Sequence, residues 1–388
     1  MRQASRCARL IGTPSLRPAA RCCARTLSSS SAVRFTEIAA LPEAVRAVER
    51  ETDVVEGAPL FVERDATRRV VEALERRAAN PSEGDGLDAD ADFTCPSCGF
   101  TTFASKSFRL TCAKCGQCRE ELPARDAYLL TGARGAGKSV ALAQIVTQAR
   151  ARGWLCLFVA RARDVGHHGD YVVPSPHHAG RFEEPSQSRE VLVAFREAHA
   201  DALASVKATA EAAERWGCDN LQELVATALD AKGRGDEAST ALANVVESLR
   251  AHDAAPVLIA VDEYSALFEA STAYFYDGAS LKPDDLVHIR ALRALDATGV
   301  APEKRLARGA YVLADSQTRG GVLGPRDRRL GIAHPPFEIP VGEFSDAEFA
   351  AAVDRYAAAG FGGADDVAAL KLATQRVPGL LFERLALM

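Results

Sequence analysis

The feature that most constrains this chain is a glycine-rich stretch, LLTGARGAGKSVALAQ, at residues 129–144. A short apolar run that predicts a strand leads into the pattern Gly-x-x-x-x-Gly-Lys-Ser, and apolar residues then recur at helical spacing. Strand, glycine loop and helix are the context of a phosphate-binding loop, because the loop amides surround a phosphate at a helix N-terminus. Lys138 is expected to reach the β- and γ-phosphates, and Ser139 to offer its hydroxyl to Mg²⁺. The alternative is a glycine-rich turn that matches the four specified positions of the motif by chance.

A second apolar run, PVLIAVDEYSALF at residues 256–268, ends a predicted strand in two carboxylates. Asp262 is expected to hold the Mg²⁺ shell, and Glu263 is a candidate to polarise a water for attack on the γ-phosphate. For Glu263 the alternative is a surface carboxylate beside the site. The Asp–Glu pair is weak evidence alone, but it becomes strong when it follows a phosphate loop.

Three more apolar runs, at residues 154–160, 310–314 and 337–341, bring the expected parallel sheet to five strands, and the helices that follow suit a helical lid over the nucleotide. The predicted fold is therefore an α/β P-loop NTPase of AAA+/STAND type with a long helical insertion at residues 188–252.

The strand at 310–314 is followed by Asp315, Ser316 and Gln317, where the AAA+ class places a polar γ-phosphate sensor. A carboxylate that faces a phosphate is repelled unless Mg²⁺ lies between them, so Ser316 or Gln317 is the expected contact.

Five of the ten cysteines fall within 24 residues, which hold two Cys-x-x-Cys-Gly turns. Their spacing predicts a small zinc ribbon in which Cys95, Cys98, Cys112 and Cys115 bind one Zn²⁺ tetrahedrally. Four thiolates leave no open coordination position, so the ribbon is expected to be a structural module. Redox-active or idle cysteines are the alternatives, and Cys118 is surplus.

Residues 1–36 contain seven Arg and a run of Ser but no Asp or Glu, which predicts a mitochondrial transit peptide that ends near residue 27. The alternative is a basic arm that touches nucleic acid. Without residues 1–27 the chain keeps 41 basic and 52 acidic side chains, a net charge of −11. Such a body repels phosphate backbones, so we expect mostly protein partners with limited rRNA contact. No apolar run is long enough to span a membrane.

The domain boundaries expected from these patterns fall at five places along the chain. They are a transit peptide (1–27), an N-terminal helical extension with an acidic linker (28–92), the zinc ribbon (93–120), the nucleotide-binding domain (121–340) and the helical lid (341–388).

Several stretches in fixed order resemble the death-associated protein 3 family, GTP-binding proteins of the mitochondrial small ribosomal subunit. Beside the loop they are WLCLFVARARD, RFEEPSQSREVLVAF, VLIAVDEYSALF, LKPDDLVHIRAL, AYVLADSQT, PFEIPVGEFSDAEF and VPGLLFERL. The resemblance covers roughly residues 125–388. It implies a ribosome-bound protein of the mitochondrial matrix, with nucleotide contacts at Gly132, Ala133, Arg134, Gly135, Ala136, Gly137, Lys138 and Ser139.

The resemblance leaves the following points open. Guanine specificity (GTP or GDP rather than ATP) rests on it alone, because no Asn-Lys-x-Asp signature is present. The family often has a smaller residue at the position of Glu263, so hydrolysis stays an open question here, and the zinc ribbon is outside the family pattern. The alternative functions are a free AAA+/STAND-type ATPase or GTPase switch and a zinc-dependent nucleic-acid binder, which the charge of −11 disfavours.

Overall fold

The computed structural model describes residues 33–38, 41–52, 60–80, 93–94, 101–102, 125–230, 234–296, 299–315, 337–361 and 367–386. Three sequence predictions lie outside these residues and stay predictions. They are the transit peptide, the sensor contact at Ser316 or Gln317, and the zinc ribbon of Cys95, Cys98, Cys112 and Cys115.

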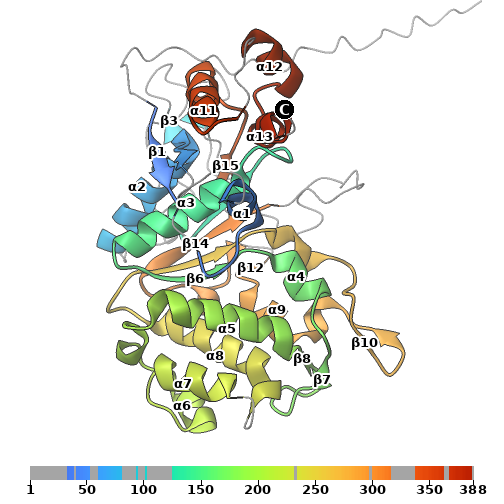
Figure 1. Ribbon diagram of the computed structural model, residues 1–388. Helices are drawn as coiled ribbons and strands as arrows, with labels where there is room; N and C mark the ends of the chain where they lie inside the picture. The colour runs from blue at the N-terminus through green and yellow to red at the C-terminus, as the bar shows by residue number, and fades with distance from the viewer. Residues whose placement is uncertain are drawn as a thin grey trace, which may run out of the picture.

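A five-stranded parallel sheet forms the centre of the molecule, as predicted (Figure 1). Its strands are β5 (Ala127–Thr131), β6 (Leu155–Val159), β9 (Val257–Val261), β14 (Gly309–Ala314) and β15 (Phe337–Pro340), in the spatial order β15-β5-β14-β9-β6. Every residue of β5, β6, β9 and β14 is buried, which explains their unbroken apolar sequences, since both faces of the sheet are covered. β14 lies between the strand that leads into the glycine loop and the strand that ends before Asp262.

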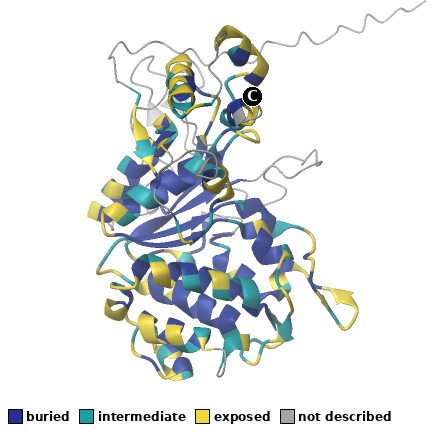
Figure 2. Ribbon diagram, in the orientation of Figure 1, coloured by how far each residue is buried: buried dark blue, intermediate teal, exposed yellow. Residues whose placement is uncertain are grey.

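Helices cover the two faces of the sheet (Figures 1 and 2). On one face, α2 (Asp65–Ala79) and α3 (Lys138–Ala151) share an apolar core with Tyr128 and Leu130 of β5. On the other face, α5 (Pro185–His199), α7 (Leu221–Leu229) and α8 (Ala238–Ala251) share a core with Leu129. The alternation along β5 follows from the two-residue period of a strand.

Shorter elements surround this frame. They are β1 (Phe35–Glu37), α1 (Arg46–Thr52), β2 (Leu60–Val62), β3 (Phe93–Thr94), β4 (Thr101–Thr102), α4 (Ala162–His167), β7 (Val173–Pro174), β8 (Phe182–Glu183), α6 (Ala210–Trp216), β10 (Phe275–Tyr276), β11 (Ala279–Ser280), α9 (Val287–Leu292), β12 (Leu295–Asp296) and β13 (Gly299–Val300). No helix of the described residues is both long and apolar enough to cross a membrane.

The C-terminal part is helical, as the sequence predicted. It contains α11 (Asp346–Ala358), α12 (Val367–Thr374) and α13 (Pro378–Ala386). Phe349, Leu370 and Leu381 form a small apolar core that also includes Val62 of β2. A segment from the N-terminal half is therefore packed into the C-terminal helices.

The stretch that distinguishes the family resemblance, RFEEPSQSREVLVAF, forms the start of α5. Its Glu184 is fully buried and caps the helix, because the carboxylate accepts the amides of Ser186 at 3.1 Å and Gln187 at 3.0 Å. Burial raises the pKa of the Glu184 carboxyl from 4.5 to about 7, although these hydrogen bonds favour the charged form. Ionisation of the Glu184 carboxyl therefore lowers the free energy of unfolding.

Replacing Glu184 by glutamine should change how stability depends on pH. The proton on Glu184 stabilises the folded state fully below pH 4.5, and this contribution disappears as pH rises through about 7. Glutamine does not ionise, so E184Q should gain stability relative to the parent between pH 5 and 8, on the order of 2 kcal/mol. Urea unfolding at several pH values measures it. The matched control is E190Q, an exposed residue of the same helix, and a difference between E184Q and the parent that is constant with pH would contradict the prediction.

Candidate functional site

The loop between β5 and α3 has a backbone that only glycine adopts easily. Gly132, Gly135 and Gly137 have φ values of +151°, +79° and +94°. A Cβ atom at Gly132 would lie 2.1 Å from the carbonyl oxygen of Val341, so a side chain there would require the chain after β15 to move. The glycines of the motif are therefore needed for the loop's shape, independently of any ligand.

Lys138 is the first residue of α3, and its side chain folds back over the loop. Its Nζ donates hydrogen bonds to the carbonyl oxygens of Gly132 and Ala133, both at 2.9 Å. The first N–H groups of a helix have no partner within the helix, so the start of α3 presents donors at the same place as this buried ammonium group. Donors and positive charge together suit a phosphate.

Ser139 and Asp262 meet across the carboxyl edge of the sheet. The Ser139 hydroxyl forms a hydrogen bond with the Asp262 carboxylate, whose Oδ1 also accepts the Glu263 amide at 2.8 Å. Burial raises the pKa of Asp262 from 3.8 to about 6, and Glu263 raises it further, while the hydrogen bonds and Lys138 lower it. A hydroxyl and a buried carboxylate in contact are the oxygen ligands that Mg²⁺ prefers, so the donor set fits this ion.

Glu263 follows Asp262 in the chain, but its carboxylate has a different binding partner. Its backbone is left-handed, with φ 54°, which is uncommon for a residue other than glycine. Its carboxylate accepts the amide of Arg163 in α4, and burial raises its pKa. Strained backbone of this kind is often found at functional sites, but here the carboxylate is bound to α4.

Asp315 lies at the same edge of the sheet. It is buried directly after β14, and its amide donates to the carbonyl oxygen of Leu130 at 2.9 Å. The ends of β5, β9 and β14 therefore bring together the loop, Asp262 and Asp315. This is the edge of a parallel sheet at which ligands bind in open α/β proteins.

The C-terminal helices, for which the sequence predicts a lid over the nucleotide, touch the loop at a contact that the sequence does not specify. The Gly379 amide, at the start of α13, donates to the carbonyl oxygen of Gly135 at 2.9 Å. A Cβ atom at Gly379 would lie 3.1 Å from the Gly135 Cα, closer than side chains normally come. A side chain at Gly379 would force the loop to shift by a few tenths of an ångström, so glycine favours this contact, which connects the loop to the helical part.

Arg64 is a second residue that the sequence analysis missed. Its guanidinium donates to the carbonyl oxygens of Ala136 at 3.3 Å, Gly342 at 2.8 Å and Glu343 at 2.8 Å. It also lies 4.8 Å from the centre of the Phe344 ring. One buried side chain just before α2 therefore holds the glycine loop and the chain after β15 together. Its only sequence signal is an arginine between an apolar run and a predicted helix.

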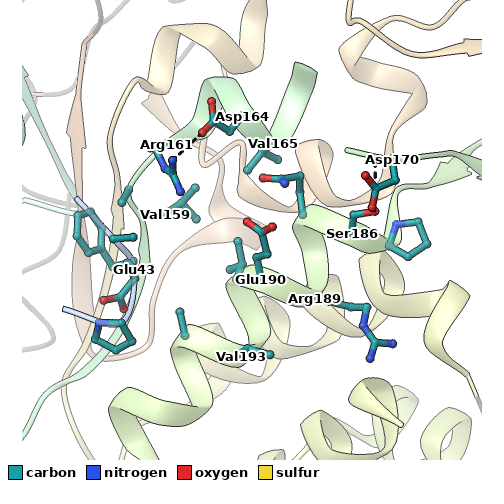
Figure 3. Close-up of a pocket in the computed structure, with 18 of the residues that line it drawn as sticks. Glu43, Val159, Arg161, Asp164, Val165, Asp170, Ser186, Arg189, Glu190 and Val193 are labelled. Atoms are coloured by element: carbon teal, nitrogen blue, oxygen red, sulfur yellow. Dashed lines mark hydrogen bonds and ion pairs between the residues drawn. The ribbon is translucent and has the colours of Figure 1, made fainter. Parts of the chain in front are cut away.

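A cavity of about 760 Å³ lies beyond the end of β6, between α4 and α5 (Figure 3). The Arg161–Asp164 pair lies on one side, the Asp170–Ser186 pair on the other, and Glu190 lies between them. No residue of the loop lines this cavity. Carboxylates outnumber cations among its lining residues, which disfavours a phosphate there, so the glycine loop is the better phosphate site.

Comparison with known protein families shows to which family this chain belongs. Residues 120–323, more than half of the chain, match the family described as mitochondrial ribosomal death-associated protein 3. The chain belongs to this family. The match contains the loop, Asp262 and Asp315, whereas the cysteine cluster and the C-terminal helices lie outside it.

A relative within this family is the small ribosomal subunit protein mS29 of Bos taurus, which is 26% identical over 211 residues. The match covers 52% of this chain and 51% of that protein, so it spans about half the length of the relative.

The similar solved structures have a low overall likeness to this chain. The Walker-type ATPase PABY2304 of Pyrococcus abyssi is 14% identical with a TM-score of 0.35, over 66% of this chain and 61% of that one. The ORC2 protein of Aeropyrum pernix in its ADP form is 12% identical with a TM-score of 0.30, over 64% and 50%. The α/β P-loop NTPase fold is evident from the sheet and the loop themselves.

Proposed function

We propose that this chain is a structural component of the mitochondrial small ribosomal subunit and binds a guanine nucleotide with Mg²⁺ at residues 132–139. The observation that carries the proposal is the family match over residues 120–323, which includes the loop and Asp262. The relative from Bos taurus is named as a small ribosomal subunit protein. Ribosomal proteins and, to a limited extent, rRNA are the partners that follow, in the mitochondrial matrix.

The geometry of the loop supports the nucleotide part of the proposal. The amides at the start of α3 and the Lys138 ammonium group would hold the β- and γ-phosphates, and Mg²⁺ would bind between the Ser139 hydroxyl and the Asp262 carboxylate. The position of β14 between β5 and β9 supports assignment to the AAA+/STAND type. In this assembly the nucleotide stabilises the fold and helps the chain to dock.

The proposed import route and the zinc ribbon rest on the sequence alone. Residues 1–27 would direct the chain to the mitochondrion, and the four cysteines at 95, 98, 112 and 115 would bind Zn²⁺. Zinc content of the purified chain, compared with a C95S/C112S variant, tests the ribbon, and equal metal content in the two would reject it.

The test of the proposed function is sedimentation of a mitochondrial extract that contains the tagged full chain. We expect the chain to sediment with the small ribosomal subunit and to stay with it after the subunit is separated from the large one. A chain that stays among the soluble proteins at the top of the gradient would overturn the ribosomal assignment.

Competition of GTP against ATP for binding to the purified chain tests which base the site prefers. Tighter binding of ATP would overturn guanine specificity.

One structural observation favours a second candidate, a free AAA+/STAND-type ATPase or GTPase switch. The Gly379–Gly135 hydrogen bond connects the loop to the C-terminal helices, so a change in the loop on hydrolysis would reach them directly. Such a switch needs a residue that activates water, and Glu263 is the carboxylate nearest in sequence to Asp262.

Hydrolysis by a Glu263→Gln variant separates the two candidates. The Glu263 carboxylate is bound to the Arg163 amide in α4, so we expect slow hydrolysis by the parent and a change of less than about twofold in the variant. Phosphate release from GTP and ATP measures it, with E190Q as the control. A loss of about a hundredfold or more, the usual effect of removing a general base, would favour the switch.

A further inference from the structure

A groove of about 960 Å³ lies on the side of the sheet opposite the glycine loop. Most of its lining residues come from α8, from α9 and the residues beside it, and from the segment before β14. Asp126, the residue before β5, lies 3.4 Å from Arg305 of the groove, whereas the glycine loop follows the other end of the same strand. The groove and the proposed nucleotide site are therefore at opposite ends of the sheet.

The groove is basic although the protein as a whole is acidic. Its six cationic residues face three carboxylates that also line it, Glu247, Asp284 and Glu303. The cationic residues are Arg181, Arg250, Arg290, Arg293, Lys304 and Arg305. Three of them form ion pairs: Arg293 with Asp284, Arg181 with Asp285 at 3.7 Å and Arg305 with Asp126 at 3.4 Å. In the part of the chain that the structure describes, Arg250, Arg290 and Lys304 form no ion pair with a carboxylate. This local excess of positive charge contrasts with the net charge of the whole chain, which is −5.

Two of these cations, Arg250 and Lys304, are held in place by neutral acceptors. Arg250 donates to the Tyr311 hydroxyl at 3.0 Å and to the carbonyl oxygen of Ala291 at 2.9 Å. Lys304 Nζ donates to the carbonyl oxygen of Arg293 at 2.6 Å. Burial lowers the pKa of Lys304, and Arg250 lowers it further, while Glu303 only partly compensates. Like charges that are held near one another are stabilised by a bound polyanion.

We propose that this groove binds the phosphate backbone of RNA, in single-stranded form. Guanidinium groups match phosphate oxygens in two-point hydrogen bonds, and five of the six cations are arginines. Arg293 lies over the ring of Phe268, 4.6 Å from its centre, and guanidinium planes stack on the unpaired bases of single strands. The inference names a site for the rRNA contact of the proposed function, but the groove's charge is independent of the glycine loop.

Arg290 is the residue with which to test the groove. It is exposed on α9, and among the described residues its side chain forms no hydrogen bond or ion pair, so we expect its removal to leave the fold intact. Binding of a mixed-sequence RNA of about 12 nucleotides to the full chain is measured by fluorescence anisotropy at several salt concentrations. We expect R290A to weaken binding about threefold to tenfold and to reduce the salt dependence by about one ion. R290E should weaken binding further, and R290K should restore most of it.

Arg196, an exposed arginine at the end of α5, provides the matched control because it lies outside the groove. R196A should bind RNA like the parent. Equal loss in R196A and R290A, or no loss in R290E, would overturn the proposal. A groove that binds an acidic peptide such as polyglutamate in preference to RNA would also overturn it.

Failure of this proposal differs from failure of the proposed function. If R290E sediments with the small subunit and binds RNA normally, the groove assignment is wrong and the ribosomal function stands. If the parent fails to sediment with the subunit, the ribosomal function is wrong whatever the groove binds.

Discussion

Replacing Lys138 by alanine should weaken the binding of Mg²⁺-GTP by about a hundredfold or more. The Lys138 ammonium group is buried and donates to the carbonyl oxygens of Gly132 and Ala133, so it lies directly over the loop that would hold the phosphates. Charge-assisted hydrogen bonds to a phosphate contribute about 3 kcal/mol, which corresponds to roughly two orders of magnitude in affinity. Titration with a fluorescent GTP analogue measures the loss.

A second variant separates lost charge from lost packing. K138M keeps the apolar stem of the side chain and removes the ammonium group, so it should lose as much affinity as K138A while its thermal unfolding stays closer to that of the parent. Lys207, which is exposed and far from the loop in sequence, gives the control K207A. Binding by K138M within about twofold of the parent would show that the loop is not the phosphate site.

The sheet could be predicted from the sequence because each of its strands is defined locally. A central parallel strand is buried on both faces, so runs such as LCLFV and VLIAV identify it without reference to other parts of the chain. The helix that the apolar spacing after the loop predicts is found at Lys138–Ala151. The placement of Asp262 beside Ser139 then follows, because parallel strands end at a common edge.

Contacts that join distant segments could not be predicted in this way. Arg64 binds the loop across 72 positions and the chain after β15 across 278 positions, and nothing in its local sequence distinguishes it from a surface arginine. The same holds for Gly379, whose need for a small side chain arises only where α13 meets Gly135. The direction of the Glu263 carboxylate depends on a left-handed backbone angle, which the Asp–Glu pair does not specify.

Net charge does not show how charge is distributed over the surface. The charge of −11 without residues 1–27 is a sum over the whole body, whereas arginines from four separated segments line the groove beside α8 and α9. Arg181, Arg250 and Arg290 are far apart in the sequence and form no charge run, so their convergence depends on the tertiary fold. The acidic remainder of the surface would then confine RNA to this one groove.

Replacing Asp262 by asparagine should remove Mg²⁺-dependent nucleotide binding and, at the same time, stabilise the nucleotide-free protein. Burial raises the pKa of Asp262 to about 6, so the proton on this carboxyl stabilises the folded state fully below pH 3.8, and that contribution is lost as pH rises through about 6. At pH 7 the ionised carboxylate therefore costs about 3 kcal/mol. Asparagine keeps the size and an acceptor for the Glu263 amide, but it does not ionise.

The two effects of D262N can be measured in one set of experiments on thermal unfolding. Without nucleotide, D262N should unfold at a higher temperature than the parent at pH 7.5, and the two should converge toward pH 4. With Mg²⁺-GTP, the parent should be stabilised and D262N should not, because the ion needs the carboxylate charge. D201N, which changes an exposed aspartate, should behave like the parent in both conditions. If Mg²⁺-GTP stabilises D262N as much as it stabilises the parent, Asp262 does not hold the ion. If D262N without nucleotide is no more stable than the parent, the ionised carboxylate does not destabilise the fold. If both expected results are obtained, the chain tolerates the buried charge of Asp262 because the ion neutralises it. A residue kept for binding in this way lowers the stability of the empty protein, whereas a residue kept for packing raises it.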